Sequence, residues 1–231
     1  MEPKKPNRLV QSVSLPIKFV ILIWIIHLAQ WFLHLELGFL GVYPREISGL
    51  RGIIFSPLLH GDFGHIISNT PPLLVLTTLV MFFYRRVAIP SFLMIYFLTG
   101  LAVWIFGRPV YHIGASGVIY GLVAFVFWNG IFRFNVKSIA LALIVAFYYG
   151  SMFIGILPGQ EGISWESHLL GGLVGIFVSF WFKDKIEKDE EKPKYSWELE
   201  EGNQNEEYFL DRDIFEKTKA ERERDERNRL W

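Results

Sequence analysis

Long apolar runs with almost no charged residues are the feature that most restricts what this chain can fold into. About 20 apolar residues in an α-helix cross the hydrocarbon core of a bilayer, and every backbone polar group there must be hydrogen-bonded within the protein. The runs therefore predict an all-α membrane protein, built as a six-transmembrane helical bundle. The six predicted spans occupy residues 18–37, 64–84, 88–106, 115–132, 138–157 and 166–182.

Charge is concentrated behind the last of these runs. Residues 183–231 hold 12 of the 23 Lys and Arg residues and 17 of the 23 Asp and Glu residues. The net charge of zero therefore averages a slightly basic apolar part and an acidic tail, and it does not identify a partner. We expect a cytoplasmic N-terminal segment over residues 1–17, a membrane domain over 18–182 and a charged cytoplasmic tail over 183–231, with no nucleic-acid partner.

Mixed acidic and basic residues with a few aromatic ones fill the tail over residues 205–229. This pattern predicts a solvated, partly helical extension, with a partner-binding segment as the alternative. At the other end, the apolar stretch from Phe19 to Leu35 is longer than that of a signal peptide and lacks a small-residue cleavage site, so we expect a retained helix.

Positively charged residues near the span ends set the expected orientation, because Lys and Arg are retained in cytoplasmic loops. Arg45, Arg51 and Arg108 flank one side of the membrane, and ten such residues flank the other. Both termini are therefore predicted in the cytoplasm, and the second, fourth and sixth spans run from outside inward. The ten residues are Lys4, Lys5, Arg8, Lys18, Arg85, Arg86, Arg133, Lys137, Lys183 and Lys185.

A large first loop connects the first two spans, from Gly38 to Gly61. Its apolar stretch Ile53–Leu59 is too short to cross a bilayer, so we expect it at the interface or against the bundle. Its backbone groups still need hydrogen-bond partners, which favours local helix or packing on protein.

A serine stands between glycines at the start of the fourth span, in Gly114-Ala115-Ser116-Gly117. A lone serine in a membrane helix is often structural. At a helix start, however, backbone N–H groups lack intrahelical partners and the helix dipole favours negative charge. An oxyanion formed by attack of Ser116 on a carbonyl would lie beside these donors, and Gly114 and Gly117 leave room for a substrate backbone.

A histidine occupies the corresponding place in the sixth span. His168 precedes glycines spaced four residues apart, Gly171 and Gly175, and the fourth span carries Gly117 and Gly121 at the same spacing. Small residues four apart let two helices approach closely, so packing through these faces would bring Ser116 and His168 together. A neutral imidazole there can accept the hydroxyl proton and return it to the leaving amine. A structural histidine is the alternative.

The remaining polar groups favour a dyad over a triad. Tyr120 lies one turn below Ser116 on the same helix face, so its ring can pack against the imidazole. No Asp or Glu lies inside the second, fourth or sixth span. Glu166 is close to His168 in sequence, but residues two apart on a helix point to different faces. We therefore predict a Ser–His pair without an orienting carboxylate.

A third polar group lies in His60-Gly61-Asp62-Phe63-Gly64-His65-Ile66-Ile67-Ser68-Asn69. His65 and Asn69 are one turn apart and share a helix face, and both can donate hydrogen bonds to an oxyanion. Metal binding is the competing interpretation, but zinc motifs on helices use histidines four apart with a Glu between them. The chain also has no cysteine, which excludes disulfides, thiolate metal sites and cysteine nucleophiles. We expect no metal and no cofactor.

Taken together, HGDFGHIISN in the second span, GASGVIYG in the fourth and HLLGG in the sixth resemble the rhomboid intramembrane serine proteases. The resemblance covers about residues 18–182 and includes the span count and the order and spacing of the motifs. Each motif alone is weak, whereas the three in this order are specific. The first loop departs from the family, because Leu50-Arg51 stands where many members carry a Trp-Arg pair.

The resemblance implies a set of roles. Ser116 would be the nucleophile and His168 the general base, with an oxyanion hole made by His65, Asn69 and the backbone N–H of Ser116. His60 would support the first loop, and Tyr120 would stack on the catalytic imidazole. Substrates would be transmembrane segments of other membrane proteins, cut near the outer face after entering past the second and fifth helices. The expected location is the bacterial cytoplasmic membrane.

Two other functions stay open at this point. An inactive rhomboid-like protein could bind transmembrane segments without cutting them, although inactive relatives typically lose the serine or the histidine and this chain keeps both. A small transporter or channel would need mid-membrane charges or broken helices in corresponding halves. Pro71 and Pro72 interrupt the second span, but no matching break occurs elsewhere.

Overall fold

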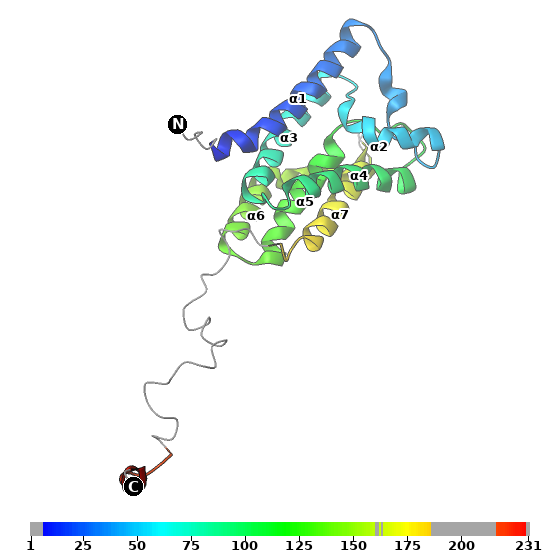
Figure 1. Cartoon of the computed structure of the whole chain (residues 1–231). Helices are drawn as coiled ribbons and strands as arrows, with labels where there is room; N and C mark the ends of the chain where they lie inside the picture. The colour runs from blue at the N-terminus through cyan, green and yellow to red at the C-terminus, as the bar shows by residue number, and fades with distance from the viewer. Residues whose placement is uncertain (1–6, 160–161, 163, 186–215, 230–231) are drawn as a thin grey trace. The chain divides into compact units, whose positions relative to one another are not determined.

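The computed structural model describes residues 7–159, 162, 164–185 and 216–229 in two compact units, residues 1–190 and 191–231. The described part is helical, apart from turns, loops and one isolated β-bridge between Val42 and His112. Figure 1 shows the helices of the first unit gathered into one bundle. These helices are α1 Arg8–Phe32, α2 Gly52–Phe55, α3 Phe63–Phe83, α4 Ala88–Phe106, α5 Ser116–Arg133, α6 Val136–Tyr149 and α7 Trp165–Trp181.

Five of these helices are long and apolar enough to cross a membrane. They are α1, α3, α4, α5, and α6 together with the 3₁₀ helix η4, Gly150–Ile156, that continues it. The sixth predicted span corresponds to α7, which has 17 residues. At 1.5 Å per residue α7 is about 25 Å long, somewhat shorter than a typical hydrocarbon core of about 30 Å. The six-span count therefore stays a prediction.

The first helix begins at Arg8, ten residues before the predicted start of the first span. Asn7 caps it, because its side-chain oxygen accepts the N–H of Leu9 at 3.1 Å. Contacts with the end of α3 hold the first turns: Arg8 donates to the carbonyl of Phe82 at 3.0 Å and Ser12 to that of Met81 at 3.3 Å. Hydropathy marks only the apolar part of a helix, so these polar turns were missed.

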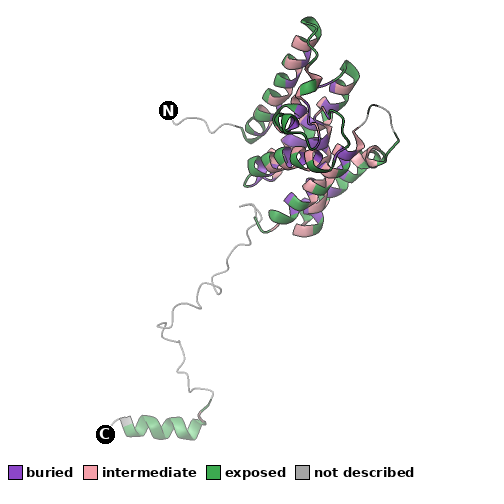
Figure 2. Cartoon of the chain, turned by 90° about the vertical axis from the view of Figure 1, so that its right-hand side faces the viewer, coloured by how far each residue is buried: buried purple, intermediate pink, exposed green. Residues whose placement is uncertain are grey.

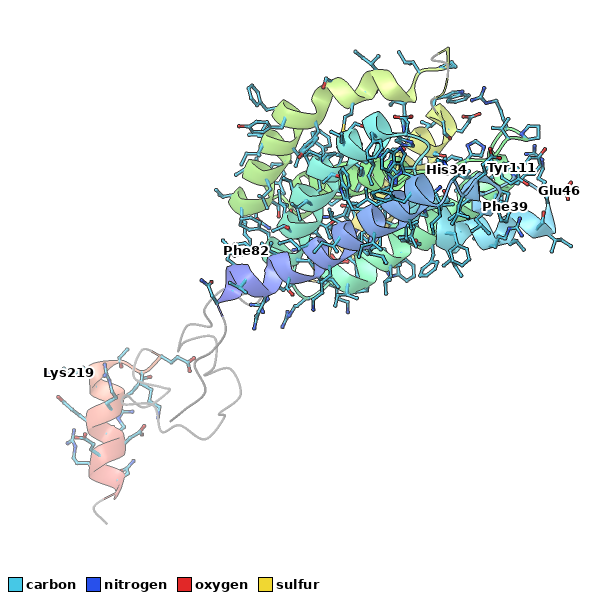
Figure 3. All side chains as sticks on the ribbon, turned by 90° about the horizontal axis from the view of Figure 1, so that it is seen from above. His34, Phe39, Glu46, Phe82, Tyr111 and Lys219 are labelled. Atoms are coloured by element: carbon cyan, nitrogen blue, oxygen red, sulfur yellow. The ribbon has the colours of Figure 1, made fainter. Side chains whose placement is uncertain are left out.

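Three helices begin at the same end of the bundle, as the sequence predicts for the second, fourth and sixth spans. The starts of α3 and α5 meet where Gly114 lies against the ring of His65. The far ends of α5 and α7 meet where Arg133 donates to the carbonyl of Lys185 at 2.6 Å. In Figure 3, Phe82 lies at the opposite end of the bundle from Glu46 and Tyr111.

The first loop is largely helical and packs on α4. It contains the 3₁₀ helices η1 Leu37–Leu40, η2 Ile47–Arg51 and η3 Ser56–Leu58, together with α2. Ile53 lies against Gly100 of α4, and the hydroxyl of Tyr96 donates to the carbonyl of Ile54. Of the two places expected for this short apolar stretch, the interface or the bundle, the structure has it in short helical turns packed on α4.

The core lies where the helices face one another, as the buried residues in Figure 2 show. Helix α5 contributes more buried residues to it than α4, α6 or α7 does. Leu122 and Phe125 of α5 are fully buried, as are Ile95 of α4 and Val178 of α7. Outward-facing positions carry large apolar side chains, such as Phe147 of α6 at 83% exposure. Exposed apolar side chains around an apolar core suit a lipid environment.

The second unit contains α9, Lys219–Arg229, all of whose described side chains are exposed. Glu221 caps its start by accepting the N–H and hydroxyl of Thr218 at 2.8 and 2.7 Å. Figure 3 draws the side chains of this helix, including Lys219. The described part of the tail thus contains one helix, α9, while the apolar residues from Tyr208 to Phe215 lie outside the described part.

Candidate active site

Ser116 and His168 lie within hydrogen-bond distance, because their two helices begin side by side. Ser116 is the first residue of α5 and His168 lies in the first turn of α7. The Nε2 atom of His168 is 2.8 Å from Oγ of Ser116. A nucleophile and a base at this separation can exchange a proton directly.

The glycine faces of α5 and α7 produce this proximity. A Cβ atom on Gly171 would fall on the carbonyl of Gly117, and one on Gly175 would fall on the carbonyl of Gly121. Side chains at these positions would force the two helices apart. The predicted packing through glycines four residues apart is therefore confirmed.

The imidazole of His168 is held on its other nitrogen and on one face. Nδ1 lies 2.9 Å from the carbonyl oxygen of Gly155 in η4. Because a carbonyl can only accept, Nδ1 carries the hydrogen and Nε2 is left to accept from Ser116. Tyr120 stacks on the ring, with centroids 4.1 Å apart and planes 7° from parallel, and its hydroxyl donates to the carbonyl of Met152 at 2.7 Å.

No carboxylate bonds the imidazole of His168 in the part of the chain that the structure describes. Glu166 is only two residues away, but its side chain is buried against Arg108, with which it forms an ion pair. A second guanidinium nitrogen of Arg108 lies 3.2 Å from the other carboxylate oxygen of Glu166. The geometry is that of a Ser–His pair whose imidazole is oriented by a backbone carbonyl.

The start of α3 brings two further predicted residues to the same place. Asp62 caps this helix by accepting the N–H of His65 at 2.9 Å. Asn69, one turn below His65, is 6% exposed, and its amide nitrogen has no hydrogen-bond partner among the described residues. Such a donor is unusual inside a protein, and an oxyanion would satisfy it.

Two neighbours fix the position of His65. Gly114 has φ +109°, and a Cβ atom there would lie 2.5 Å from Nε2 of His65, so both its conformation and its contact require glycine. The ring of His60 lies edge-on to that of His65, with centroids 4.9 Å apart. His60 is 2% exposed, and burial, together with the neighbouring His65 and His27, lowers its pKa to about 3.

A cavity of about 1070 Å³ opens over these residues. Its wall includes side chains from the starts of α3, α5 and α7, which are His65, Asn69, Ser116, Tyr120 and His168. The backbone N–H of Ser116 is at the first position of α5, so it has no acceptor in the preceding turn of a helix. A peptide carbonyl placed next to Ser116 would thus find donors from two helices.

Among the described residues, no three His, Cys, Asp or Glu side chains come close enough together to bind a metal ion. His60 and His65 are neighbours, and their rings meet edge to face with centroids 4.9 Å apart.

Sequence reasoning missed Gly155 and His112. The contact of Gly155 is made by its backbone, so no side-chain pattern points to it. His112 is buried beside the cavity and bonds to Ser164, and burial lowers its pKa. Its position two residues before Gly114, among apolar neighbours, was a signal that could have been used.

Comparison with known proteins gives a consistent result. The sequence matches the Rhomboid domain over residues 47–185. An uncharacterized protein of Mycobacterium tuberculosis (strain ATCC 25618 / H37Rv) is 34% identical over 186 residues, covering 77% of this chain and 77% of that protein. An uncharacterized protein of Mycobacterium leprae (strain TN) is 32% identical over 171 residues, covering 70% of this chain and 68% of its own length. With the five apolar helices, the match identifies a multi-pass integral membrane protein.

Proposed function

The chain belongs to the rhomboid family, and from this premise we propose that it is an intramembrane serine endopeptidase with Ser116 and His168 as its catalytic dyad. Its substrates are transmembrane segments of other membrane proteins, cut within or near the membrane. One observation carries the proposal above the others: Nε2 of His168 lies 2.8 Å from Oγ of Ser116, beside the buried amide of Asn69, which has no partner in the part of the chain that the structure describes.

In the first half of the reaction, Oγ of Ser116 attacks the carbonyl carbon of the peptide bond while Nε2 of His168 takes the hydroxyl proton. The oxyanion of the tetrahedral intermediate is stabilised by Asn69, His65 and the backbone N–H of Ser116. When the intermediate collapses, the C–N bond breaks and His168 protonates the leaving amine. The acyl group then remains on Ser116 as an ester.

In the second half, water enters the cavity and His168 removes one of its protons as the oxygen attacks the ester. The new tetrahedral intermediate collapses to release the carboxylic acid, and the proton returns from His168 to Oγ of Ser116. The carbonyl of Gly155 keeps Nδ1 protonated throughout both halves, so Nε2 alone exchanges protons.

We place the site near the outer end of the bundle. In this arrangement α7 is a sixth, short span and both termini are cytoplasmic, with the positive residues at the start of α1 and at the ends of α3, α5 and α7 facing the cytoplasm. We also propose that the protein resides in a bacterial cytoplasmic membrane.

The test compares cleavage of a model transmembrane substrate in liposomes by the full chain and by its Ser116→Ala and His168→Ala variants. Both changes are expected to remove cleavage, and a fluorophosphonate probe should label the wild type but not Ser116→Ala. Cleavage by both alanine variants would overturn the dyad. A wild-type chain that neither cleaves nor labels, but binds transmembrane segments, would indicate an inactive family member.

A further inference from the structure

His112 is the buried centre of a hydrogen-bond network next to the dyad. It lies in the loop between α4 and α5 and is 3% exposed. Its Nε2 is 3.0 Å from the carbonyl of Arg108, and its Nδ1 is 2.5 Å from Oγ of Ser164 at the start of α7. One imidazole thus connects the loop that precedes Ser116 to the helix that carries His168.

The acceptors of this network set the direction of its hydrogen bonds. The carbonyl of Arg108 can only accept, so Nε2 of His112 is the donor. In the neutral ring Nδ1 then accepts the hydroxyl hydrogen of Ser164, and Ser164 can accept from Ser167, whose Oγ is 2.6 Å away. Burial lowers the pKa of His112 despite the nearby carboxylate of Glu166, which favours this neutral form.

The backbone of His112 is fixed from the side of the first loop. It exchanges two hydrogen bonds with Val42, at 3.0 and 2.9 Å. Its carbonyl also accepts from Oγ of Ser56 at 2.9 Å. The carbonyl of Ser56 in turn accepts the N–H of Gly114, again at 2.9 Å. The residues leading to Ser116 are therefore anchored before the imidazole reaches across to α7.

On the α7 side the last residue of the network, Ser167, packs against α5, the helix that begins with Ser116. A Cβ atom on Gly117 would lie 3.1 Å from the carbonyl of Ser167, so Ser167 lies directly against the residue after Ser116. The ion pair of Arg108 and Glu166 links the same two segments, but the Arg108 side chain is 55% exposed. The imidazole of His112, at 3% exposure, is the buried one of the two links.

We infer that His112 is a positioning residue: through Ser164 it fixes the start of α7 relative to α5, and so sets the separation of Ser116 and His168. This inference rests on the proposed dyad. It predicts that the reactivity of Ser116 depends on two side chains that touch neither the peptide bond nor the catalytic imidazole.

The experiment measures the rate of fluorophosphonate labelling of Ser116 in the full-length protein in detergent, per folded molecule, together with kcat and KM for a model transmembrane substrate. An Asn amide can place its oxygen near the position of Nδ1, whereas a Gln amide extends toward that of Nε2. His112→Asn should therefore keep the bond to Ser164 and label within about threefold of wild type. His112→Gln and Ser164→Ala should label about tenfold or more slowly, with kcat reduced and KM little changed, because small misplacements of reacting groups lower rates strongly.

Combining the two changes provides an internal check. The double variant His112→Gln/Ser164→Ala should label no more slowly than His112→Gln alone, because both changes remove the same link. The matched control is Ser179→Ala, which removes a fully buried hydroxyl from the far part of the same helix and should leave labelling unchanged. Ser164→Ala removes a single hydroxyl, so it tests the link even if the His112 variants fail to fold.

Two results would overturn the inference. One is wild-type labelling per folded molecule by both His112→Gln and Ser164→Ala; the other is equal slowing by Ser179→Ala. The proposed function fails separately, if Ser116→Ala still labels or cleaves. Loss of labelling in Ser116→Ala together with unaffected His112 and Ser164 variants would leave the protease in place and remove only the positioning role.

Discussion

The carbonyl oxygen of Gly155 lies 2.9 Å from Nδ1 of His168, in the place where a carboxylate stands in a catalytic triad. A neutral carbonyl fixes the tautomer and the ring plane, but it stabilises an imidazolium less than a carboxylate does. The 3₁₀ helix that supplies Gly155 also accepts the hydroxyl of Tyr120, at Met152. The end of the fifth span therefore holds both the base and the ring that stacks on it.

Replacing Gly155 by alanine should disturb the base directly. The added Cβ atom would run into the hydroxyl of Tyr120 and lie 3.2 Å from Nδ1 of His168. We expect kcat to fall about 10- to 100-fold, because the imidazole must move away from Ser116. Gly150→Ala is the matched control, since nothing lies within 4 Å of its Cβ atom in the same 3₁₀ helix. Equal activity of the two variants in a cleavage assay would contradict the orienting role of Gly155.

Alanine substitution at two adjacent glycines of α7 should change the stability of the protein differently. Gly171→Ala places a Cβ atom on the carbonyl of Gly117, and we expect a loss of about 1–3 kcal/mol in the free energy of unfolding together with lower activity. Gly172 has nothing within 4 Å of its Cβ position, so Gly172→Ala should be neutral or slightly stabilising. Denaturant titration in detergent, alongside cleavage, tests the pair. Similar losses in both variants would show that helix packing is not the cause.

Asn69→Ala should lower kcat strongly but change the stability of the fold little. Its amide nitrogen is buried without a partner among the described residues, so no protein hydrogen bond from this atom is broken by Asn69→Ala. Loss of an oxyanion donor lowers kcat about 10²- to 10³-fold. Asn129 provides the contrast, because its amide donates to the carbonyl of Phe125 at 2.7 Å away from the cavity.

Asn129→Ala should therefore lower the melting temperature while leaving kcat per folded molecule near the wild-type value. A large drop in melting temperature for Asn69→Ala, with kcat unchanged, would show that Asn69 is not part of the oxyanion hole.

The stability of the fold should depend on pH through His60. Burial lowers the pKa of His60 from its ordinary value of 6.5 to about 3. Between these two values the unfolded chain binds a proton here that the folded chain does not, so the free energy of unfolding rises with pH. The contribution is up to about 1.4 kcal/mol per pH unit. His112, whose pKa burial also lowers, acts in the same direction.

The melting temperature of the wild type should fall as the pH is lowered from 6.5 to about 4, and we expect it to fall less steeply in His60→Phe. The measurement is tryptophan fluorescence in detergent micelles. A decline as steep as that of the wild type would mean that His60 does not resist protonation in the folded protein.

Hydropathy and residue spacing predicted much of the fold and the site. Apolar runs located the helices, and glycines four apart on two of them predicted the contact that brings Ser116 and His168 together. One turn between His65 and Asn69 predicted a shared face. The polar start of the first helix was not predicted, because its stability comes from the cap at Asn7 and contacts with α3 rather than from hydropathy.

The sequence by itself identified the candidate side chains for the proposed chemistry and the end of each helix that they occupy, because helical periodicity and charge near span ends are local properties. Only the tertiary structure decided what holds the base. The acceptor for His168 is a backbone carbonyl, a group that every residue has, so no residue type marks it. The link from His112 to Ser164 joins residues 52 apart in the chain, and it exists only because two helices and a loop meet at one end of the bundle.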